Sequence, residues 1–312
     1  MVPIMSEPIH ITTFYRFTTL GSEQVTQLEI LLNQFAEKTS LRGLILIGAE
    51  GINATMSGSA ETLEGAKNQI AEFLKLDDLV FKDSVGAKHP FREFSVKIKP
   101  EIVSLGKPGF VPSSPVNAHL SPREWHEALK DPNAIVLDTR NDYEVEIGKF
   151  KNAVDFNTQE FNEFPQKVRD SGFAKDKPVL MYCTGGIRCE KAILEMREQG
   201  FEKVFQLEGG ILNYLKEFPN AEFEGECFVF DYRVAVDQDL EPSKQYSLCP
   251  HCGQPAKEVI LCEKCGRTET ICLKCQGAGV LTCSKNCAYH VRTGSGSSKT
   301  HLQELKKRGR IN

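Results

Sequence analysis

Apolar residues in the first hundred positions follow helical spacing in two segments and strand-like patterns in four. The predicted helices are Glu23–Lys38 and Ser59–Leu76, where apolar residues recur every three or four positions. The predicted strands are Ile11–Phe17, Leu44–Ile47, Ile52–Met56 and Phe94–Ile98. The order strand, helix, strand, strand, helix, strand predicts a ferredoxin-like α+β sandwich. Fold alone implies no function.

A second apolar pattern lies near residue 180 and brings in candidate chemistry. Val179–Tyr182 reads as a buried strand, and Glu190–Gln199 reads as a helix that Gly200 ends. Cys183 therefore begins a glycine-containing loop between a strand and a helix N-terminus. Backbone amides there converge on an anion, and a cysteine so placed ionises below its free pKa. A buried structural cysteine is the alternative, but two glycines and an arginine in the loop favour a reactive thiolate. The loop residues after the cysteine are Thr184, Gly185, Gly186, Ile187 and Arg188.

The last ninety residues hold nine cysteines, eight of them in close pairs. Paired thiols at this spacing predict two tetrahedral structural zinc sites, which would fold a segment poor in apolar residues. Unmetalled thiols are the alternative, His251 or His290 could replace a cysteine, and spacing does not show which pairs share an ion. The tail from Arg292 onward is basic and could bind phosphates, or it could be merely solvated or disordered. The pairs are Cys249 with Cys252, Cys262 with Cys265, Cys272 with Cys275, and Cys283 with Cys287.

Composition limits the class of protein and the cellular compartment to which the chain can belong. The 312 residues are 40% hydrophobic and 26% charged with a formal charge of −4, which gives no global signal for nucleic acid. We expect no membrane span and no signal peptide, and so a cytoplasmic protein whose thiols are reduced or bind metal. We predict three domains: residues 1–106 are ferredoxin-like (acylphosphatase-like), 107–220 are α/β with a linker at 107–116, and 221–312 are cysteine-rich with the basic tail.

Four segments of the middle block resemble the rhodanese family in the same order along the chain. They are Ala134–Arg140, which ends in Asp-x-Arg, Gly148–Ala153, the Cys183 loop, and Val204–Ile211 with its Gly-Gly turn. The resemblance implies a rhodanese-like α/β domain in which cysteine carries sulfur as a persulfide. We expect Asp138 and Arg140 to brace the loop by hydrogen bonds. The Cys-x4-Arg spacing counts against a cysteine phosphatase, whose loop has one more residue.

The whole chain resembles the tRNA uridine hydroxylase family. The resemblance rests on Gly48–Gly58, on Cys183–Ala192 and on the cysteine-rich tail. It implies oxygen-dependent conversion of the wobble uridine of tRNA to 5-hydroxyuridine, with the anticodon loop as partner. It also implies that the loop cysteine, Cys183 here, is essential.

No flavin, nicotinamide or haem fingerprint is visible, so the activating group for hydroxylation is expected from the protein or from an unrecognised cofactor. Our hypothesis is that Cys183, as thiolate or persulfide, adds to C6 of uracil and leaves a C5 carbanion that reacts with molecular oxygen. The peroxide then collapses and the sulfur leaves. The loop amides would hold the sulfur anion, and Arg188 would orient the loop through a carboxylate. Cys189 either resolves an oxidised Cys183 or is a small buried residue in the first helical turn.

Basic residues of the first block are the best local signal for RNA, although nearby acids dilute it. On charge alone a solvated face is the default, and the family resemblance reverses that preference. A persulfide sulfurtransferase is the competing function, and a zinc-dependent RNA-binding or scaffold protein is a third. The candidate RNA contacts are Lys82, Lys88, Arg92, Lys97 and Lys99.

Overall fold

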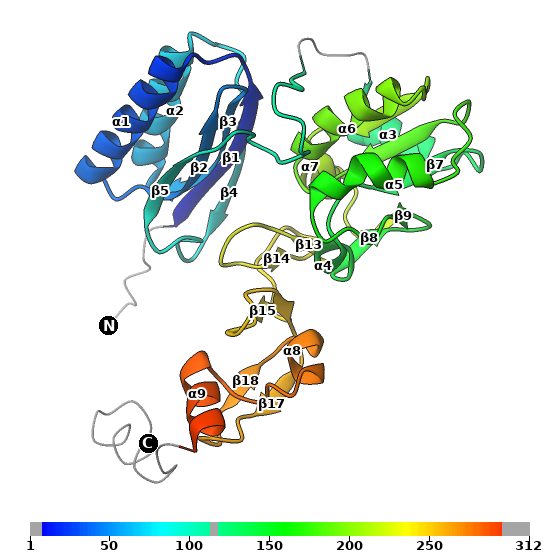
Figure 1. The fold of residues 1–312 in the computed structure, drawn as a ribbon. Coiled ribbons are helices and arrows are strands. Elements are labelled where there is room, and N and C mark those ends of the chain that lie inside the picture. Colours follow the sequence, from blue (N-terminus) through cyan, green and yellow to red (C-terminus); the bar gives the residue numbers. More distant parts are fainter. Residues whose placement is uncertain (1–7, 113–117, 295–312) are drawn as a thin grey trace. The chain divides into compact units, whose positions relative to one another are not determined.

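The computed structural model describes residues 8–112 and 118–294. Two compact units divide the chain: residues 1–231 with 236–242, and residues 232–235 with 243–312. The first unit contains the two larger α/β bodies and the second contains the paired cysteines (Figure 1). In the described part of the chain, no helix is long and apolar enough to cross a membrane. The expected contribution of the basic tail beyond Gly294 lies outside the described residues.

The N-terminal body is a five-stranded sheet covered on one face by two helices (Figure 1). Leu28 and Leu32 of one helix and Ile70 of the other pack on Ile45 and Met56 of the sheet. The strands, in the order β4-β1-β3-β2-β5, are antiparallel except for β2 beside β5. The elements are β1 (Ile9–Phe17), α1 (Ser22–Lys38), β2 (Arg42–Gly48), β3 (Gly51–Gly58), α2 (Ala60–Leu74), β4 (Lys82–Gly86) and β5 (Phe94–Ile98).

The ferredoxin-like class is confirmed, but the strand that completes it was wrongly identified. Phe94–Ile98 was expected to close the sheet, whereas the fourth strand of the motif is Lys82–Gly86, which pairs antiparallel with β1. Phe94–Ile98 instead adds a fifth strand at the opposite edge, beside β2. The β4 strand has little apolar alternation because it is an edge strand that carries Lys82 and Asp83. Its sequence therefore lacks the signal by which strands are found.

The second body is a parallel sheet in the order β6-β11-β10-β7-β9. Successive residues of the central strand β10 enter different cores, because Met181 joins one apolar cluster and Leu180 and Tyr182 join the other. The elements are β6 (His119–Leu120), α3 (Pro122–Ala128), β7 (Ile135–Asp138), α4 (Asp142–Val145), β8 (Gly148–Phe150), β9 (Val154–Asp155), η1 (Phe161–Glu163), α5 (Phe164–Asp170), β10 (Val179–Tyr182), α6 (Ile187–Glu198), β11 (Val204–Leu207), α7 (Gly210–Glu217) and β12 (Phe223–Gly225), which pairs with β8.

The described residues of the cysteine-rich unit form two short hairpins and two short helices. Its two buried clusters consist mainly of cysteines, and Ala256 and Ile271 are the other buried members. The segment around it adds two more short strands. The elements are β13 (Cys227–Phe228), β14 (Ala235–Val236), β15 (Ser247–Leu248), β16 (Pro255–Ala256), β17 (Val259–Leu261), β18 (Thr268–Thr270), α8 (Leu273–Gly277) and α9 (Lys285–Thr293).

Candidate active site

The Cys183 loop lies at the carboxyl end of β10, where Tyr182 pairs with Asp138 at the end of β7. The helix after the loop begins at Ile187, three residues earlier than predicted, so Ile187 and Arg188 belong to its first turn. Gly186 permits this early start because its φ is 102°, a conformation that L side chains rarely adopt. The sulfur therefore lies directly against a helix N-terminus.

The backbone at Gly210, in the next βα connection, packs against the Cys183 loop. The backbone N–H of Ile211 donates to the Cys183 carbonyl at 3.0 Å, and that of Leu212 donates to the Thr184 carbonyl at 3.2 Å. A Cβ atom on Gly210 would lie 2.5 Å from the Cys183 carbonyl oxygen. The predicted Gly-Gly turn thus permits a backbone approach that a larger residue would prevent.

The Cys183 sulfur lies in a buried, anion-favouring environment. The residue is 1% exposed, and the backbone N–H of Gly186 donates to its Sγ at 3.0 Å. Burial raises the pKa of Cys183, but the Cys189 thiol, the Arg188 charge and the amides of Arg188 and Gly186 outweigh it and lower the pKa to about 5. Burial and the adjacent Cys183 anion raise the pKa of Cys189 well above its ordinary value. Cys183 is thus the thiolate of the pair and Cys189 the thiol.

Arg188 is held by the carboxylate of Glu144 in α4. Its Nη1 donates to Oε2 at 2.6 Å and its Nη2 to Oε1 at 2.7 Å, and both side chains are nearly inaccessible. The Thr184 hydroxyl lies 3.4 Å from Oε1 of the same carboxylate and 3.2 Å from the Phe228 carbonyl oxygen. Glu144 therefore fixes both ends of the loop. Sequence reasoning predicted a carboxylate partner for Arg188 but did not identify it.

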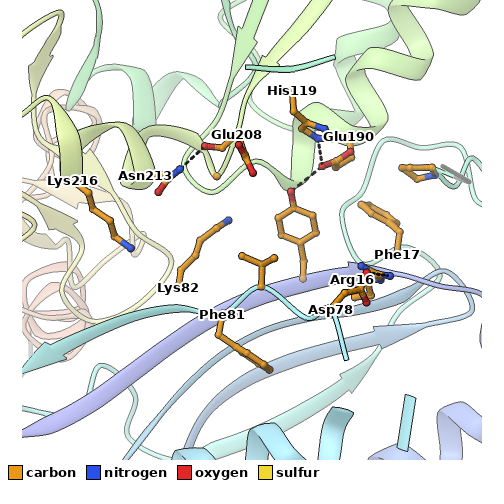
Figure 2. A pocket seen from close by; sticks show the side chains of 14 residues that line it. Arg16, Phe17, Asp78, Phe81, Lys82, His119, Glu190, Glu208, Asn213 and Lys216 are labelled. Carbon is orange, nitrogen blue, oxygen red and sulfur yellow. Dashed lines mark hydrogen bonds and ion pairs between the residues drawn. The ribbon is translucent and has the colours of Figure 1, made fainter. Parts of the chain in front are cut away.

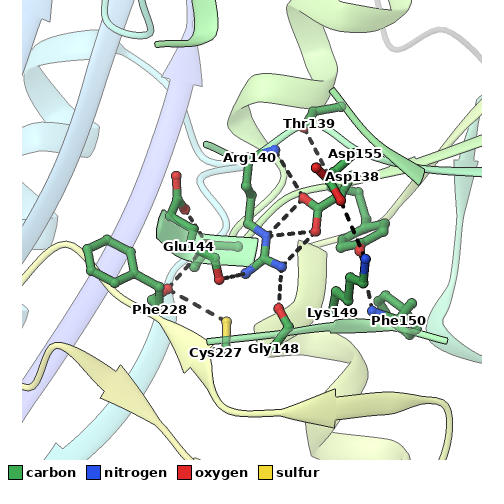
Figure 3. Close-up of polar contacts among 12 residues, drawn as sticks. Asp138, Thr139, Arg140, Glu144, Gly148, Lys149, Phe150, Asp155, Cys227 and Phe228 are labelled. Atoms are coloured by element: carbon green, nitrogen blue, oxygen red, sulfur yellow. Dashed lines mark hydrogen bonds and ion pairs between the residues drawn. The ribbon is translucent and has the colours of Figure 1, made fainter. Parts of the chain in front are cut away.

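Asp138 and Arg140 form a second buried pair behind the loop (Figure 3). Arg140 Nε donates to Oδ1 at 2.9 Å and Nη2 to Oδ2 at 2.7 Å, while Nη2 also donates to the Gly148 carbonyl at 2.6 Å. The guanidinium also reaches the backbone of α4, because Nη1 lies 3.4 Å from the Glu144 carbonyl oxygen. This geometry ties β7, α4 and β8 together beneath the reactive loop.

The N-terminal body contacts the loop through Tyr15 and Lys82. The Lys82 ammonium donates to the Gly185 carbonyl and lies 5.0 Å from the centroid of the Tyr15 ring. The Tyr15 hydroxyl donates to Oε1 of Glu190 at 3.0 Å. Burial lowers the pKa of Lys82 to about 8, an effect that the Cys183 and Glu190 charges partly oppose. Two residues of the first body therefore cover the active-site loop of the second.

Beside this contact lies a cavity of about 610 Å³ lined by both bodies of the first unit (Figure 2). In its wall, Oε1 of Glu190 accepts hydrogen bonds from Tyr15 and from Gln206 at 2.8 Å and lies 3.1 Å from His119 Nε2. The bond to Glu190 raises the pKa of His119. Sequence reasoning named neither Tyr15, His119 nor Glu190 as functional, although Glu190 belongs to the recognised Cys183–Ala192 segment. Aromatic and basic side chains complete the wall, among them Phe17, Phe81, Lys82 and Lys216.

The family models divide the chain as this architecture does. Residues 9–102 match the UPF0176 acylphosphatase like domain, 121–217 the rhodanese-like domain and 224–288 the rhodanase C-terminal model. A protein of Bdellovibrio bacteriovorus named tRNA uridine(34) hydroxylase is 48% identical over 293 residues, 92% of this chain and 83% of that protein. The chain belongs to the tRNA uridine(34) hydroxylase family. Relatives of the same name from Picosynechococcus sp. and Synechocystis sp. are 44% and 43% identical, with 78% of this chain and 82% and 87% of theirs covered.

This member of the tRNA uridine(34) hydroxylase family carries two four-cysteine clusters in its second unit. Cys252 and Cys272 have sulfurs 3.4 Å apart, and Cys265 and Cys283 have sulfurs 3.5 Å apart. Four ligands about 2.3 Å from a zinc ion would be about 3.8 Å from one another, so the sulfur sets fit that metal. Four sulfur ligands would leave no open coordination position on the metal, as in structural zinc sites. The clusters are Cys249, Cys252, Cys272 and Cys275, and Cys262, Cys265, Cys283 and Cys287.

The pairing interleaves along the chain, since the first cysteine pair joins the third and the second joins the fourth. Spacing could not show this, because it follows from how the hairpins fold back. Within the described residues, neither cluster includes a histidine. His251 Nε2 instead lies 2.5 Å from the Thr282 carbonyl oxygen. The ninth cysteine of the segment, Cys227, is buried in the first unit.

The candidate RNA contacts do not form one patch in this hydroxylase family member. Lys82 is on β4 and Lys97 is on β5, at opposite edges of the N-terminal sheet. Lys88 follows β4, Arg92 precedes β5 and Lys99 follows it, and these three are exposed. Only Lys82 among the five lines the cavity.

Proposed function

We propose that this protein hydroxylates uridine 34 of tRNA at C5 of the uracil ring, with Cys183 as its essential nucleophile. The observation that carries the proposal is the Cys183 sulfur, held as an anion by the Gly186 amide in a chain that is 48% identical to a protein named tRNA uridine(34) hydroxylase. A thiolate is the nucleophilic form of cysteine. The site therefore offers an activated sulfur without needing a separate base.

In the proposed reaction, Sγ of Cys183 forms a bond to C6 of uracil, and the C5–C6 π electrons move onto C5 and O4. The C5 carbanion reacts with molecular oxygen, which gives a C5 hydroperoxide once protonated. A thiol reductant supplies two electrons, so that one oxygen atom leaves as water and the other stays as the C5 hydroxyl. Loss of the C5 proton then expels the Cys183 thiolate and restores the C5–C6 double bond. Cys183 is 1% exposed, so the ring can meet the sulfur only after covering side chains move.

We place the approach of the anticodon loop at the cavity beside the Cys183 loop. An unstacked nucleotide needs an apolar surface for its base and cations for its phosphate. The aromatic ring of Phe17 supplies the first, and Lys216 supplies the second. The tRNA would thus contact both bodies of the first unit.

The deciding experiment is nucleoside mass spectrometry of tRNA from cells that lack the gene. The cells are complemented with wild type, with Cys183→Ser or with Cys189→Ser. The last is the matched control, because it makes the same cysteine-to-serine change at the neighbouring thiol. We expect 5-hydroxyuridine derivatives to return with wild type and not with Cys183→Ser, because a serine hydroxyl is a far poorer nucleophile here. Growth under isotopically labelled oxygen gas should label the new hydroxyl.

Sulfur transfer is the competing function that the rhodanese-like loop itself favours. It would appear as unchanged 5-hydroxyuridine with loss of thiolated nucleosides. Full hydroxylation by Cys183→Ser, with the variant present at the wild-type level, would overturn the proposed nucleophile. A label that comes from water and not from oxygen gas would overturn the proposed oxygen source.

A further inference from the structure

One peptide unit of the active-site loop is bound at both ends. Its carbonyl, on Gly185, accepts a hydrogen bond from the Lys82 ammonium of the N-terminal body. Its N–H, on Gly186, donates to the Cys183 sulfur at 3.0 Å. A cation on the oxygen side of an amide increases the polarity of its N–H, because hydrogen bonds in a chain polarise one another. The two contacts therefore act in the same direction on the sulfur anion.

We propose that Lys82 is a positioning residue which, through the Gly185–Gly186 peptide, aims and strengthens the amide that stabilises the Cys183 thiolate. The N-terminal body thereby sets the reactivity of the sulfur held in the rhodanese-like body. This inference deepens the proposed function and rests on it only for the use made of the thiolate. It assigns Lys82 a role distinct from the direct RNA contact that the sequence suggested.

The surroundings of Lys82 explain how a lysine is held at this position. Its ammonium lies over the Tyr15 ring, 5.0 Å from the centroid, and Tyr15 is anchored in turn by a 3.0 Å hydrogen bond to Glu190. A Cβ atom on Gly185 would lie 3.7 Å from Lys82 Nζ, in ordinary contact. Tyr15 is on β1 and Lys82 is on β4, and these two strands pair directly in the sheet. These contacts therefore hold the Lys82 ammonium in one position beside the loop.

Several charged groups act on the two ends of this contact. The groups near Cys183 are Cys189 and Arg188 on α6, with Lys82 and Tyr15 from the N-terminal body. Those near Lys82 are Cys183, Glu190, Glu208 and Lys216. Arg188 is paired with Glu144 at 2.6 Å, whereas Lys82 has no carboxylate partner among the ion pairs of the described residues. Its charge is thus directed at the loop.

The test is a titration of the Cys183 thiolate that uses neither tRNA nor oxygen. Thiolate absorbance in the ultraviolet is recorded against pH for the full-length zinc-loaded protein, and the spectrum of the same protein with Cys183→Ala is subtracted. Lys82→Met removes the charge and the donor, Lys82→Gln keeps a neutral donor, and Lys82→Arg keeps the charge. Lys151→Met is the matched control, because Lys151 donates to the Ala221 carbonyl at 3.0 Å away from the loop.

We expect Lys82→Met to raise the midpoint by about one pH unit, a roughly tenfold loss of thiolate at pH values below the midpoint. Lys82→Arg should keep the midpoint close to the wild-type value, and Lys151→Met should titrate like wild type. A wild-type midpoint in both Lys82→Met and Lys82→Gln overturns the inference, even if those variants bind tRNA less well. Because the readout is independent of turnover, absence of hydroxylation would count against the proposed function and leave this result standing.

Discussion

The ammonium of Lys191 in α6 lies 2.8 Å from Oε2 of Glu50, a residue of the hairpin turn between β2 and β3. The same ammonium donates to Oε2 of Glu101 at 2.6 Å. Lys191 is inaccessible, and both carboxylates are at least nine-tenths buried. One lysine thus joins the reactive-loop helix to the N-terminal body and to the segment that follows β5.

Backbone groups complete this network. The N–H of Ile102 donates to Oε1 of Glu50 at 2.7 Å, and the N–H groups of Leu105 and Gly106 donate to Glu101 at 3.1 and 2.9 Å. The Gly48–Gly58 segment, on which the family resemblance was partly based, therefore has a structural meaning. Its glutamate anchors the helix that carries Arg188 and Cys189.

Lys191→Met should destabilise the protein by about 3–5 kcal/mol, because it leaves two buried carboxylates without their cation. The measurement is chemical denaturation of the full chain, followed by fluorescence of Trp125, which lies in the core of the rhodanese-like body. Lys203→Met is the control, since Lys203 is exposed. A loss below about 1 kcal/mol, the usual value of an exposed ion pair, would contradict the buried network.

Apolar periodicity was enough to predict the ferredoxin-like body and the position of Cys183 between a strand and a helix, and the resemblance to a known family predicted the rhodanese-like body. They failed where a residue acts across the chain. Glu144 and Lys191 look like ordinary helical charges, and their partners lie 44 and 141 or 90 positions away in sequence. The β4 strand was missed because Lys82 and Asp83 mask its pattern. The domain boundaries at residues 106 and 220 and the roles of the site residues remain predictions.

Gly186→Ala should impair the protein, whereas Gly185→Ala should resemble wild type. Gly186 has φ 102°, and a Cβ atom there would lie 2.9 Å from the Tyr15 hydroxyl, while the only nearby atom at Gly185 is Lys82 Nζ at 3.7 Å. Strain of this kind costs about 1–3 kcal/mol. Thermal melting and 5-hydroxyuridine formation check the pair. Equal melting temperatures for the two variants would contradict the strained geometry.

Cys189→Ser should keep most of the hydroxylation activity, and Cys189→Ala should lose more. The raised pKa of Cys189 keeps it protonated, so its role toward Cys183 is that of a hydrogen-bond donor, which serine preserves and alanine removes. Quantified 5-hydroxyuridine in complemented cells measures the difference. If serine and alanine abolish activity equally, Cys189 acts instead as a resolving thiol and the donor role is wrong.

The full-length protein should contain two zinc ions per chain, one for each cysteine cluster. Cys249→Ser and Cys262→Ser should each lower the zinc content toward one, because each removes a ligand from a different cluster. Elemental analysis of purified protein measures the content, and Cys227→Ala, outside both clusters, is the control. Simultaneous loss of both ions in either variant would show that the two sites fold as one.

The contribution of the Cys183 anion to stability should depend on pH. Its pKa in the folded protein is lowered from 9.0 to about 5, so the unfolded chain holds the proton more tightly. Stability from this group is therefore fully present above about pH 9 and is lost as the pH falls toward 5. We expect the free energy of unfolding of wild type, relative to Cys183→Ala, to rise across that interval. The zinc-site cysteines are common to both proteins, so their titration cancels in the difference.

A free-energy difference that stays constant with pH would show that Cys183 is a neutral thiol in the folded protein. That result would remove the basis for its role as the nucleophile.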